Sequence, residues 1–310
     1  MSIPVVVLFS GQGAQTVGMG KDLVEADAAA RDRLARAEAV LGWPLGKVMF
    51  EGPMEELTRT ACCQPALYVH GFLLLELLRA RVPGLHVTAA AGLSLGEFTA
   101  HAAAGTFAFE DGLRIVARRG EFMEEACNAT KGSMVAVIGG DEESVRRLAA
   151  ACDLDVANLN SPGQIVLSGD ESGIDQAVAR AKEFGAKLAK KLPVAGAYHS
   201  RLMRPAQEKL AAVLAGVAFS PPQIPVWSNF AARPVAEADG IREVLTKQVT
   251  GSVRWAESMA GLVADGTRLF VELGPDRALA GMMKRTAPEA EVISASNLAE
   301  LDAMAARLLG

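Results

Sequence analysis

The sequence predicts an α/β fold in which a mainly parallel sheet is accompanied by a second, inserted sheet, and three observations lead to this prediction. Short β-branched runs alternate with long alanine- and leucine-rich stretches of helical period. From about Gly132 the order changes to strand, helix, strand, strand, helix, strand, which is the split β-α-β or ferredoxin-like unit. After residue 193 the first rhythm returns, so we expect this unit to interrupt one larger subdomain.

The expected elements follow from the hydrophobic period and the flanking turns. Residues 5–9 are apolar, β-branched and followed by a glycine turn, which predicts a core strand. The large subdomain is further expected to have strands at residues 85–91, 225–228 and 269–273, and helices at residues 26–41, 64–80, 97–104, 114–125 and 205–214. The small subdomain is expected to have strands at residues 134–138, 154–158, 165–168 and 186–192, and helices at residues 142–151 and 172–184. We therefore assign residues 1–128 and 197–310 to the large subdomain and residues 129–196 to the small one.

Composition and charge exclude several classes of protein. Half of the 310 residues are hydrophobic, and 31 basic against 36 acidic residues leave no positive excess for nucleic acid or an anionic membrane. No segment approaches the unbroken apolar length of a bilayer span, and the apolar start lacks the basic flank of a signal peptide. Four scattered cysteines have no histidine at zinc-ligand spacing. We expect a reduced, cytoplasmic monomer without metal or cofactor, which binds neither nucleic acid nor membrane.

The sequence Gly92-Leu93-Ser94-Leu95-Gly96 lies between a strand-like and a helix-like run. Such a turn holds its central serine in a strained conformation at a helix N-terminus, where partial positive charge favours a developing anion. The motif indicates a nucleophilic serine, although glycine and serine are also ordinary turn residues. Ser94 is therefore a candidate nucleophile that needs a base.

Four histidines are available as that base. Packing roles are expected for His70 and His101, which lie in apolar helices, and His86 lies in the loop before a strand. His199 instead lies at the junction between the subdomains, and clefts between domains are favoured places for sites. An imidazole there can take the serine proton and return it to a leaving thiol, unless His199 is an ordinary loop residue.

Arg119 is predicted to point into the protein core. Helical spacing places it with apolar residues 115, 116, 122 and 123, whereas Arg114 and Arg118 share the opposite face with acidic residues. A guanidinium on an apolar face needs a partner, and its fork matches a carboxylate. That partner is either an internal acid or the carboxylate of a ligand.

The turn after the first strand reads Ser10-Gly11-Gln12-Gly13-Ala14-Gln15-Thr16. As a dinucleotide fingerprint it fails, because residue 16 is not glycine and no acidic residue stands at the end of a second strand. A glycine turn beside a catalytic serine can instead supply a backbone N–H to an oxyanion.

Together these residues resemble the malonyl-CoA:acyl carrier protein transacylases. Motifs at residues 11–15, 92–97, 119–123, 160–164 and 198–200 follow that family's order and spacing, and the similarity continues to residues 271–275. The resemblance implies an α/β-hydrolase-like large subdomain with an inserted ferredoxin-like (βαββαβ) small one. It also implies ping-pong transfer of malonyl from malonyl-CoA, through a malonyl-serine, to the phosphopantetheine thiol of acyl carrier protein in fatty acid biosynthesis.

The resemblance also implies the roles of individual residues. Ser94 would be acylated, His199 would be its base, and Arg119 would bind the free malonyl carboxylate. The backbone N–H groups of Gln12 and Leu95 would form the oxyanion hole, and the main-chain carbonyl of Gln248 would orient the imidazole. The substrate would contact residues in five positions: Gln12, Leu93, Arg119, Asn160 and Tyr198.

This chain departs from the family's usual residues at three positions. Ser10 stands where proline is usual and Leu93 where histidine is usual, and neither change removes a catalytic atom. Tyr198 stands where malonyl-preferring members often have phenylalanine. The added hydroxyl alters the acyl pocket, so the preference among extender units stays open.

Several alternative functions remain. A stand-alone acyltransferase supplying a polyketide synthase would use the same site. A serine esterase or thioesterase would want a triad acid and often a His-Gly-Gly-Gly motif, which the chain lacks. A docking protein that merely binds a carrier would not need the intact site. Because carrier proteins are acidic, we expect a basic patch near the cleft, drawn from Lys187, Lys190, Lys191, Arg201 and Arg204.

Overall fold

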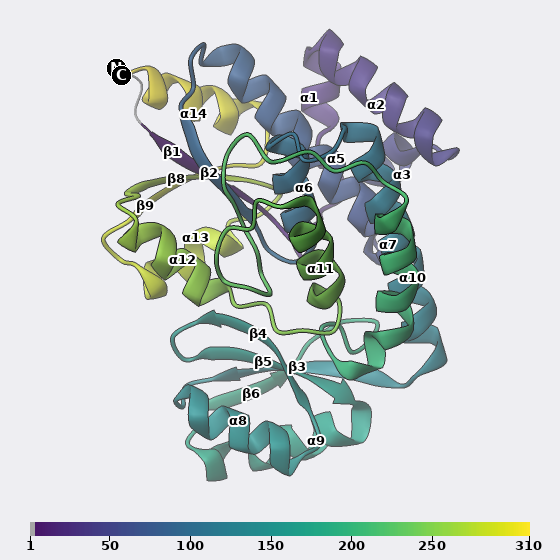
Figure 1. Ribbon diagram of the computed structural model, residues 1–310, viewed down its shortest axis with the longest axis vertical. Helices are drawn as coiled ribbons and strands as arrows, with labels where there is room; N and C mark the ends of the chain where they lie inside the picture. Colours follow the sequence, from purple (N-terminus) through teal and green to yellow (C-terminus); the bar gives the residue numbers. More distant parts are fainter. Residues whose placement is uncertain (1–3) are drawn as a thin grey trace.

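The computed structural model describes residues 4–310, and within them the strands form two separate sheets (Figure 1). The strands are β1 (Val5–Phe9), β2 (Val87–Gly92), β3 (Gly132–Ile138), β4 (Asp155–Ser161), β5 (Gln164–Asp170), β6 (Leu188–Lys191), β7 (Val226–Trp227), β8 (Leu269–Leu273) and β9 (Glu291–Ala295). One sheet is parallel with the order β7-β2-β1-β8-β9, and the other is antiparallel with the order β4-β5-β3-β6. This arrangement confirms the predicted α/β class with a second sheet.

Helices surround both sheets. Before the antiparallel sheet the chain forms α1 (Lys21–Ala26), α2 (Ala28–Leu41), α3 (Leu45–Glu51), α4 (Met54–Thr58), α5 (Thr60–Arg81), α6 (Leu95–Ala103) and α7 (Phe109–Ala129). Within that sheet's segment it forms α8 (Glu142–Ala151), α9 (Glu171–Arg180) and the 3-10 turn η1 (Ala181–Phe184). After it come the turn η2 (Arg201–Met203) and the helices α10 (Arg204–Ala215), α11 (Ala238–Gln248), α12 (Trp255–Ala264), α13 (Ala278–Thr286) and α14 (Leu298–Leu309).

The central strand β1 is buried along its whole length because helices cover both faces of the parallel sheet. Val5, Val7 and Phe9 face the large core that includes α5 and α7, whereas Val6 and Leu8 face a second core built with α12 and α13. A strand between two helical layers has no polar face, which accounts for its continuous apolar run.

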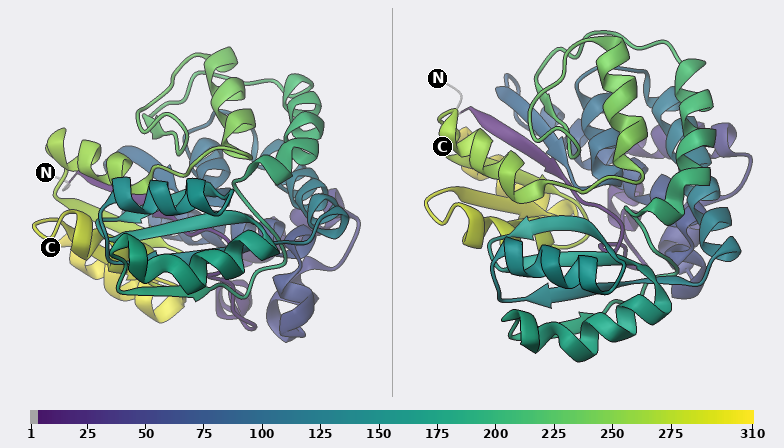
Figure 2. Two further views of the ribbon diagram at one scale, coloured as in Figure 1. Left: turned by 90° about the horizontal axis from the view of Figure 1, so that it is seen from below. Right: turned by 60° about the horizontal axis from the view of Figure 1, so that its bottom comes forward.

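The antiparallel sheet has the predicted chain order β3, α8, β4, β5, α9, β6. Helices α8 and α9 lie on its outer face (Figure 2), where Val135 and Val137 of β3 pack in a separate small core. The opposite face turns toward the large core, to which Met134 and Val166 belong. One sheet face therefore packs on its own helices and the other borders the rest of the molecule.

Strands β3 and β6 lie side by side, so the chain leaves this sheet close to where it entered. The N–H of Leu192 donates to the carbonyl of Met134 at 2.9 Å, just beyond the paired strands. The strands of this sheet span residues 132–191, inside the predicted segment 129–196. The subdomain boundaries themselves stay a prediction.

The expectation that no segment is long and apolar enough to span a bilayer was wrong for α5. This helix has 22 residues, and among the described residues it is the one helix that is long and apolar enough to cross a membrane, by length and composition only. However, 89% of its most apolar window is buried inside the protein. Apolar residues on all sides suit a helix in the core of a large domain.

Several predicted bounds also changed. The helix expected at 26–41 is α2, which begins at Ala28 because Asp27 caps it by accepting from the N–H of Ala30 at 3.0 Å, and the preceding helix α1 was not predicted. Helix α7 is longer than predicted and β6 shorter. The four cysteines lie buried with free thiols. The sequence analysis did not identify α3, α4, α11, α12, α13, β9 or α14.

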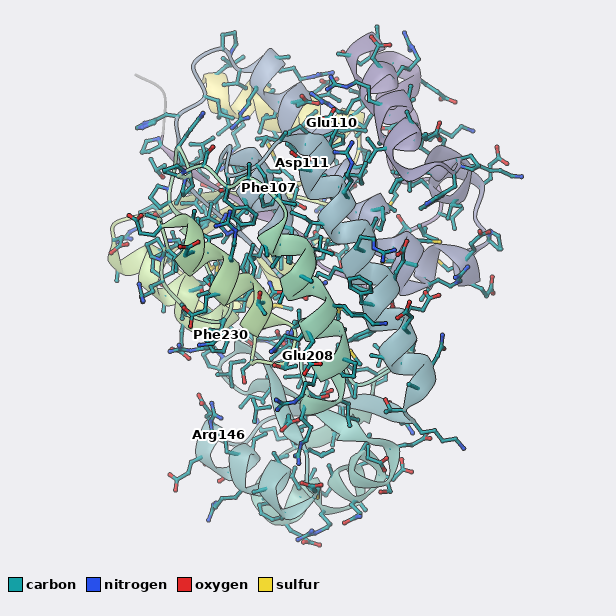
Figure 3. The ribbon with its side chains drawn as sticks, turned by 45° about the vertical axis from the view of Figure 1, so that its right-hand side comes forward. Phe107, Glu110, Asp111, Arg146, Glu208 and Phe230 are labelled. Atoms are coloured by element: carbon teal, nitrogen blue, oxygen red, sulfur yellow. The ribbon has the colours of Figure 1, made fainter. Side chains whose placement is uncertain are left out.

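Charged side chains gather on the outer surface (Figure 3). Asp111 of α7 accepts a hydrogen bond from Arg114 at 2.8 Å, and Arg118 pairs with Glu121 at 2.5 Å. These two arginines lie on the solvent face that helical spacing predicted. Arg119, between them in sequence, is only 1% exposed.

Candidate active site

Ser94 lies in the turn between β2 and α6, at the carboxyl edge of the parallel sheet. Its φ of 51° and ψ of −101° are strained for a residue with a side chain. A Cβ added to Gly92 would lie 1.9 Å from the carbonyl carbon of Gly96, and one added to Gly96 would lie 2.3 Å from the carbonyl oxygen of Phe9. Both flanking positions therefore require glycine, and the sharp turn presents Ser94 to the cleft.

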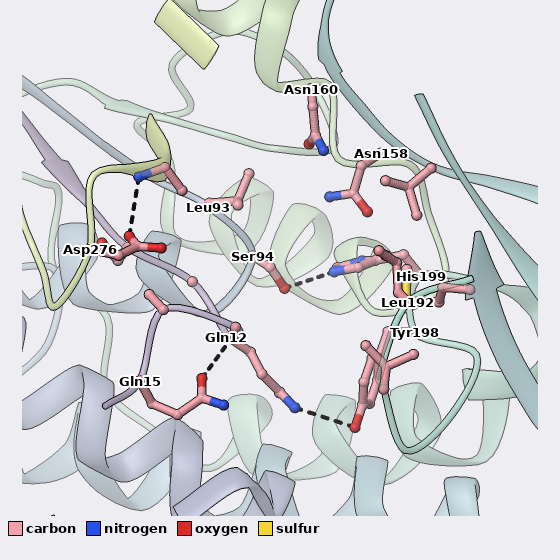
Figure 4. Close-up of a pocket in the computed structure, with 18 of the residues that line it drawn as sticks. Gln12, Gln15, Leu93, Ser94, Asn158, Asn160, Leu192, Tyr198, His199 and Asp276 are labelled. Atoms are coloured by element: carbon pink, nitrogen blue, oxygen red, sulfur yellow. Dashed lines mark hydrogen bonds between the residues drawn. The ribbon is translucent and has the colours of Figure 1, made fainter. Parts of the chain in front are cut away.

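His199 is the base nearest to Ser94 (Figure 4). Its Nε2 lies 2.7 Å from the Ser94 Oγ, and its Nδ1 lies 2.8 Å from the main-chain oxygen of Gln248 at the end of α11. Because a carbonyl oxygen only accepts, Nδ1 carries the proton and Nε2 is free to accept the serine proton. Burial, reinforced by Arg119, lowers the pKa of His199 to about 4, so the imidazole is neutral at pH 7.

Arg119 reaches the same serine oxygen from α7. Its Nη2 donates to the Ser94 Oγ at 3.0 Å and to Oε1 of Gln248 at 2.9 Å, and its Nη1 donates to Oε1 of Gln64 at 2.8 Å. Burial lowers the pKa of Arg119 to about 10, so it remains charged at pH 7. Among residues 4–310 no carboxylate forms a salt bridge with it. A buried cation with neutral direct partners is suited to receive a ligand carboxylate.

A buried network supports the turn from behind. Asn229 accepts from the N–H of Ser94 at 2.6 Å and donates to the carbonyl of Gly92 at 2.8 Å. Oε2 of Glu97 accepts from the N–H of Asn229 at 3.0 Å and from Nε2 of Gln248 at 2.7 Å. The same Gln248 nitrogen donates to the carbonyl of Ser94 at 2.9 Å. Burial raises the pKa of Glu97 to about 7.

Gln12 and Tyr198 form another wall of the site. The Tyr198 hydroxyl lies 2.6 Å from the Thr60 hydroxyl and accepts from Nε2 of Gln12 at 3.3 Å (Figure 4). Burial raises the pKa of Tyr198, so this hydroxyl stays protonated. Within residues 4–310 the backbone N–H of Gln12 has no backbone partner outside the regular elements, and Leu95 is the first residue of α6. Their shared role as oxyanion donors stays a prediction.

These side chains meet in a cleft of about 330 Å³ that has walls from both sheets. Leu93 lines it beside Ser94, and Asn158 and Asn160 reach it from β4 (Figure 4). Asn160 is 6% exposed, and its Oδ1 has no hydrogen-bond partner among the described residues. Gln164 lies outside this lining and accepts from Arg285 at 2.8 Å. The cleft therefore unites the predicted residues Gln12, Leu93, Ser94, Arg119, Asn160, Tyr198 and His199.

Comparison with known proteins shows the family of this chain. The family model of the acyl transferase domain matches residues 6–304. The malonyl CoA-acyl carrier protein transacylase of Bacillus subtilis (strain 168) is 40% identical over 298 residues, which cover 94% of this chain and 93% of that protein. The chain belongs to the malonyl-CoA:acyl carrier protein transacylase family.

Solved structures of transacylases share the whole fold. That of the malonyl CoA-acyl carrier protein transacylase from Coxiella burnetii has a TM-score of 0.96 and 33% identity, covering 100% of this chain and 99% of its own. A malonyl-transacylase in complex with its type II polyketide synthase acyl carrier protein has a TM-score of 0.95 and 34% identity, covering 98% and 100%. The transacylase fold therefore extends over nearly the entire chain.

Three residues of this transacylase site were missed in the sequence. Gln64 lies on the apolar helix α5, where nothing distinguishes it from its packed neighbours. Glu97 is one acid among many, and only its place three residues after Ser94 marks it. Asn229 could have been found, because it directly follows the strand predicted at residues 225–228, and the carboxyl ends of parallel strands are where sites form.

Proposed function

We propose that this protein transfers a malonyl group from malonyl-CoA to the phosphopantetheine thiol of acyl carrier protein in fatty acid biosynthesis. One observation carries the proposal: the Ser94 Oγ lies 2.7 Å from the His199 Nε2 and 3.0 Å from the Arg119 Nη2. A serine nucleophile needs only the first contact. The second places a buried positive charge where the acyl group will sit, which favours an acyl group that carries its own carboxylate.

In the first half-reaction, His199 Nε2 takes the proton of the Ser94 hydroxyl as Oγ bonds to the thioester carbonyl carbon. The N–H groups of Gln12 and Leu95 are proposed to stabilise the oxyanion. When the carbon–sulfur bond breaks, His199 returns the proton to the coenzyme A thiolate. Malonyl-Ser94 remains, with its free carboxylate on Arg119.

In the second half-reaction, the carrier thiol replaces coenzyme A. His199 takes the thiol proton, the sulfur attacks the ester carbonyl of malonyl-Ser94, and the serine oxygen leaves and regains the proton. The main-chain oxygen of Gln248 holds the imidazole in one tautomer throughout. These residues supply the nucleophile, the base and the anion site, so we propose that no cofactor takes part.

All residues in this scheme belong to one chain, and we propose that the enzyme acts as a monomer. We also propose a cytoplasmic location, where malonyl-CoA and carrier proteins are both present. A second candidate function, supply of a polyketide synthase, is favoured by the fold shared with a malonyl-transacylase bound to a type II polyketide synthase carrier. Transfer rates to carriers of the two kinds distinguish these functions.

The test is the intact mass of the protein after brief mixing with malonyl-CoA, followed by addition of holo carrier protein. We expect a gain of one malonyl group, absent in Ser94→Ala, which disappears as malonyl carrier protein forms. Acetyl-CoA serves as the parallel donor without a carboxylate. Steady release of coenzyme A with no malonyl adduct and no malonyl carrier protein would instead identify a hydrolase and overturn the proposal.

A further inference from the structure

Arg119 has an internal counter-ion that it does not touch. Glu97 is completely buried, and the Gln248 carboxamide lies between the two charged groups. Oε1 of Gln248 accepts from Arg119 at 2.9 Å, and Nε2 of Gln248 donates to Glu97 at 2.7 Å. The amide therefore has a cation at its oxygen and a carboxylate at its nitrogen, and both polarise it in the same direction.

Charge counting shows what must change when a malonyl group enters. Above pH 7 the free site holds one guanidinium and one ionised carboxylate, which balance. A malonyl carboxylate on Arg119 adds a second negative charge, and two carboxylates that share one buried cation do not both remain ionised. Oε1 of Glu97 has no hydrogen-bond partner within residues 4–310, whereas the malonyl carboxylate of the proposed function would contact the guanidinium directly. Glu97 is therefore the carboxylate that we expect to be protonated.

We propose that Glu97 is the internal counter-ion of Arg119, coupled through the Gln248 carboxamide, and that it takes a proton from solvent when a malonyl carboxylate reaches Arg119. The inference rests on the proposed transfer of malonyl through Ser94. It makes Glu97 a positioning residue, which acts on the acyl group through Gln248 and Arg119 and does not touch it.

Among the buried groups around α6 whose pKa is shifted, Glu97 is the one with a pKa near neutral pH. Strands β1, β2 and β7, which pack against α6, carry no titratable side chain. On α7, Arg119 acts directly on the Glu97 charge and has a pKa of about 10. On neighbouring segments, burial raises the pKa of Cys63 to about 12 and also raises those of Tyr68 and Tyr198. Burial lowers the pKa of three histidines, to about 4 for His70, about 3 for His101 and about 4 for His199.

The consequence is a pH dependence that belongs to malonyl transfer. The pKa of Glu97 is about 7, so above pH 7 the free enzyme must first bind a proton before it accepts the acyl carboxylate. The second-order rate constant for malonylation of Ser94 should therefore fall about tenfold per pH unit above that pKa. Glu97→Gln keeps the side-chain shape but cannot ionise, so its profile should be flat.

The experiment measures this rate constant by intact mass, at subsaturating malonyl-CoA from about pH 6 to about pH 9, for wild type and Glu97→Gln. Glu121→Gln is the matched control, because Glu121 is an exposed acid paired with Arg118, and it should keep the wild-type decline. A flat wild-type profile, or the same decline in Glu97→Gln, would overturn the inference. Absence of any malonyl adduct in wild type would count against the proposed function instead.

If Glu97→Gln does not fold, proton uptake by the wild-type enzyme still tests the proposal. On mixing with malonyl-CoA in weak buffer near pH 7.5, the enzyme should take up protons in step with the adduct, and near pH 5.5 it should take up almost none, because Glu97 is already protonated there. Uptake that instead grows toward acid pH would assign the proton to His199 and reject Glu97.

Discussion

In the free enzyme the Ser94 hydroxyl is engaged both as a hydrogen-bond donor and as an acceptor. It donates toward His199 and accepts from Arg119, at 2.7 and 3.0 Å. An acyl group that brings its own carboxylate offers Arg119 a stronger partner than a neutral hydroxyl. In the proposed mechanism, binding of malonyl would therefore both satisfy the cation and release the nucleophile, whereas an acetyl group would do neither.

Arg119→Ala should abolish the preference for malonyl over acetyl. Loss of a charge-assisted hydrogen bond to the acyl group is worth about 2 kcal/mol, or about thirtyfold in the ratio of kcat/KM values for the two acyl-CoA donors. The adjacent Arg118→Ala is the control, because Arg118 lies on the solvent face with Glu121 and should leave the ratio unchanged. An unaltered ratio in Arg119→Ala would show that another group selects the acyl chain.

Residue-level prediction worked where a local pattern has one physical meaning. The Gly-x-Ser-x-Gly turn and the apolar face of α7 marked Ser94 and Arg119 without any knowledge of the fold. Resemblance to a family was needed for Gln248, because no sequence pattern reveals that a main-chain oxygen accepts from an imidazole. Gln64 could not be assigned for a related reason: its role comes from a packing partner far away in sequence.

At the element scale, the turn before α6 is the least tolerant of change. Gly92→Ala should destabilise the protein by about 3 kcal/mol or more, because the new Cβ overlaps the backbone of Gly96. Gly281→Ala on α13 is the matched control: its Cβ would meet nothing within 4 Å, and alanine favours a helix by about 0.5–1 kcal/mol. Urea unfolding measures both, and equal stabilities would contradict the steric argument.

Hydrophobic pattern alone did not decide which elements were predicted, because the amphipathic helices α11 and α14 were missed. Strand β1 and helix α8 appeared at the expected residues, because each has an uninterrupted pattern and clear ends. The edge strand β9 is half-buried over most of its length, so its sequence shows neither the continuous run of a central strand nor a clean alternation. Short helices such as α4 are held by their neighbours and have too few residues to show a period.

At the scale of the whole molecule, stability should depend on buried neutral histidines. Burial lowers the pKa of His70, His101 and His199 to about 4, about 3 and about 4, below the unfolded value of about 6.5. As pH falls below 6.5, the histidines of the unfolded chain bind protons and those of the folded chain do not. The free energy of unfolding therefore decreases until the pH reaches the folded-state pKa values. Three carboxyls act in the opposite sense, because burial raises the pKa of Glu97 to about 7 and also raises those of Glu272 and Asp276.

The net loss should be at most about 2 kcal/mol between about pH 6.5 and about pH 5.5, since each histidine costs about 1 kcal/mol over that unit and Glu97 offsets about one histidine. Urea unfolding across this range measures it. His101→Asn should show a smaller slope, because it removes one of the three groups. A free energy of unfolding that stays constant over this range would contradict the prediction.

Neighbouring residues of β6 point to opposite faces of the antiparallel sheet, and this divides the predicted basic patch. Lys191 pairs in register with Val135, whose face carries α9, and it forms ion pairs with Glu171 and Asp175 there. Lys190 pairs with Ala136 on the face that borders the cleft, and within residues 4–310 it has no ion pair. Arg201 is also neutralised, by Asp153 and Asp155.

Lys190→Glu should therefore raise the KM for carrier protein several-fold at low salt, and the effect should shrink as salt screens the charge. Lys191→Glu is the matched control and should change this KM much less. KM values that respond equally to both substitutions would place the carrier elsewhere on the surface.

The neighbouring ends of the antiparallel sheet have a consequence for how this enzyme can diversify. The nucleophile, base, guanidinium and orienting carbonyl all come from outside residues 132–191, while Asn158 and Asn160 of the cleft wall and Lys190 come from inside. Because Leu192 bonds back to Met134, the segment between them begins and ends at one place. We therefore expect that chimeras which exchange this segment between relatives will keep the proposed chemistry and change the surface offered to the carrier protein.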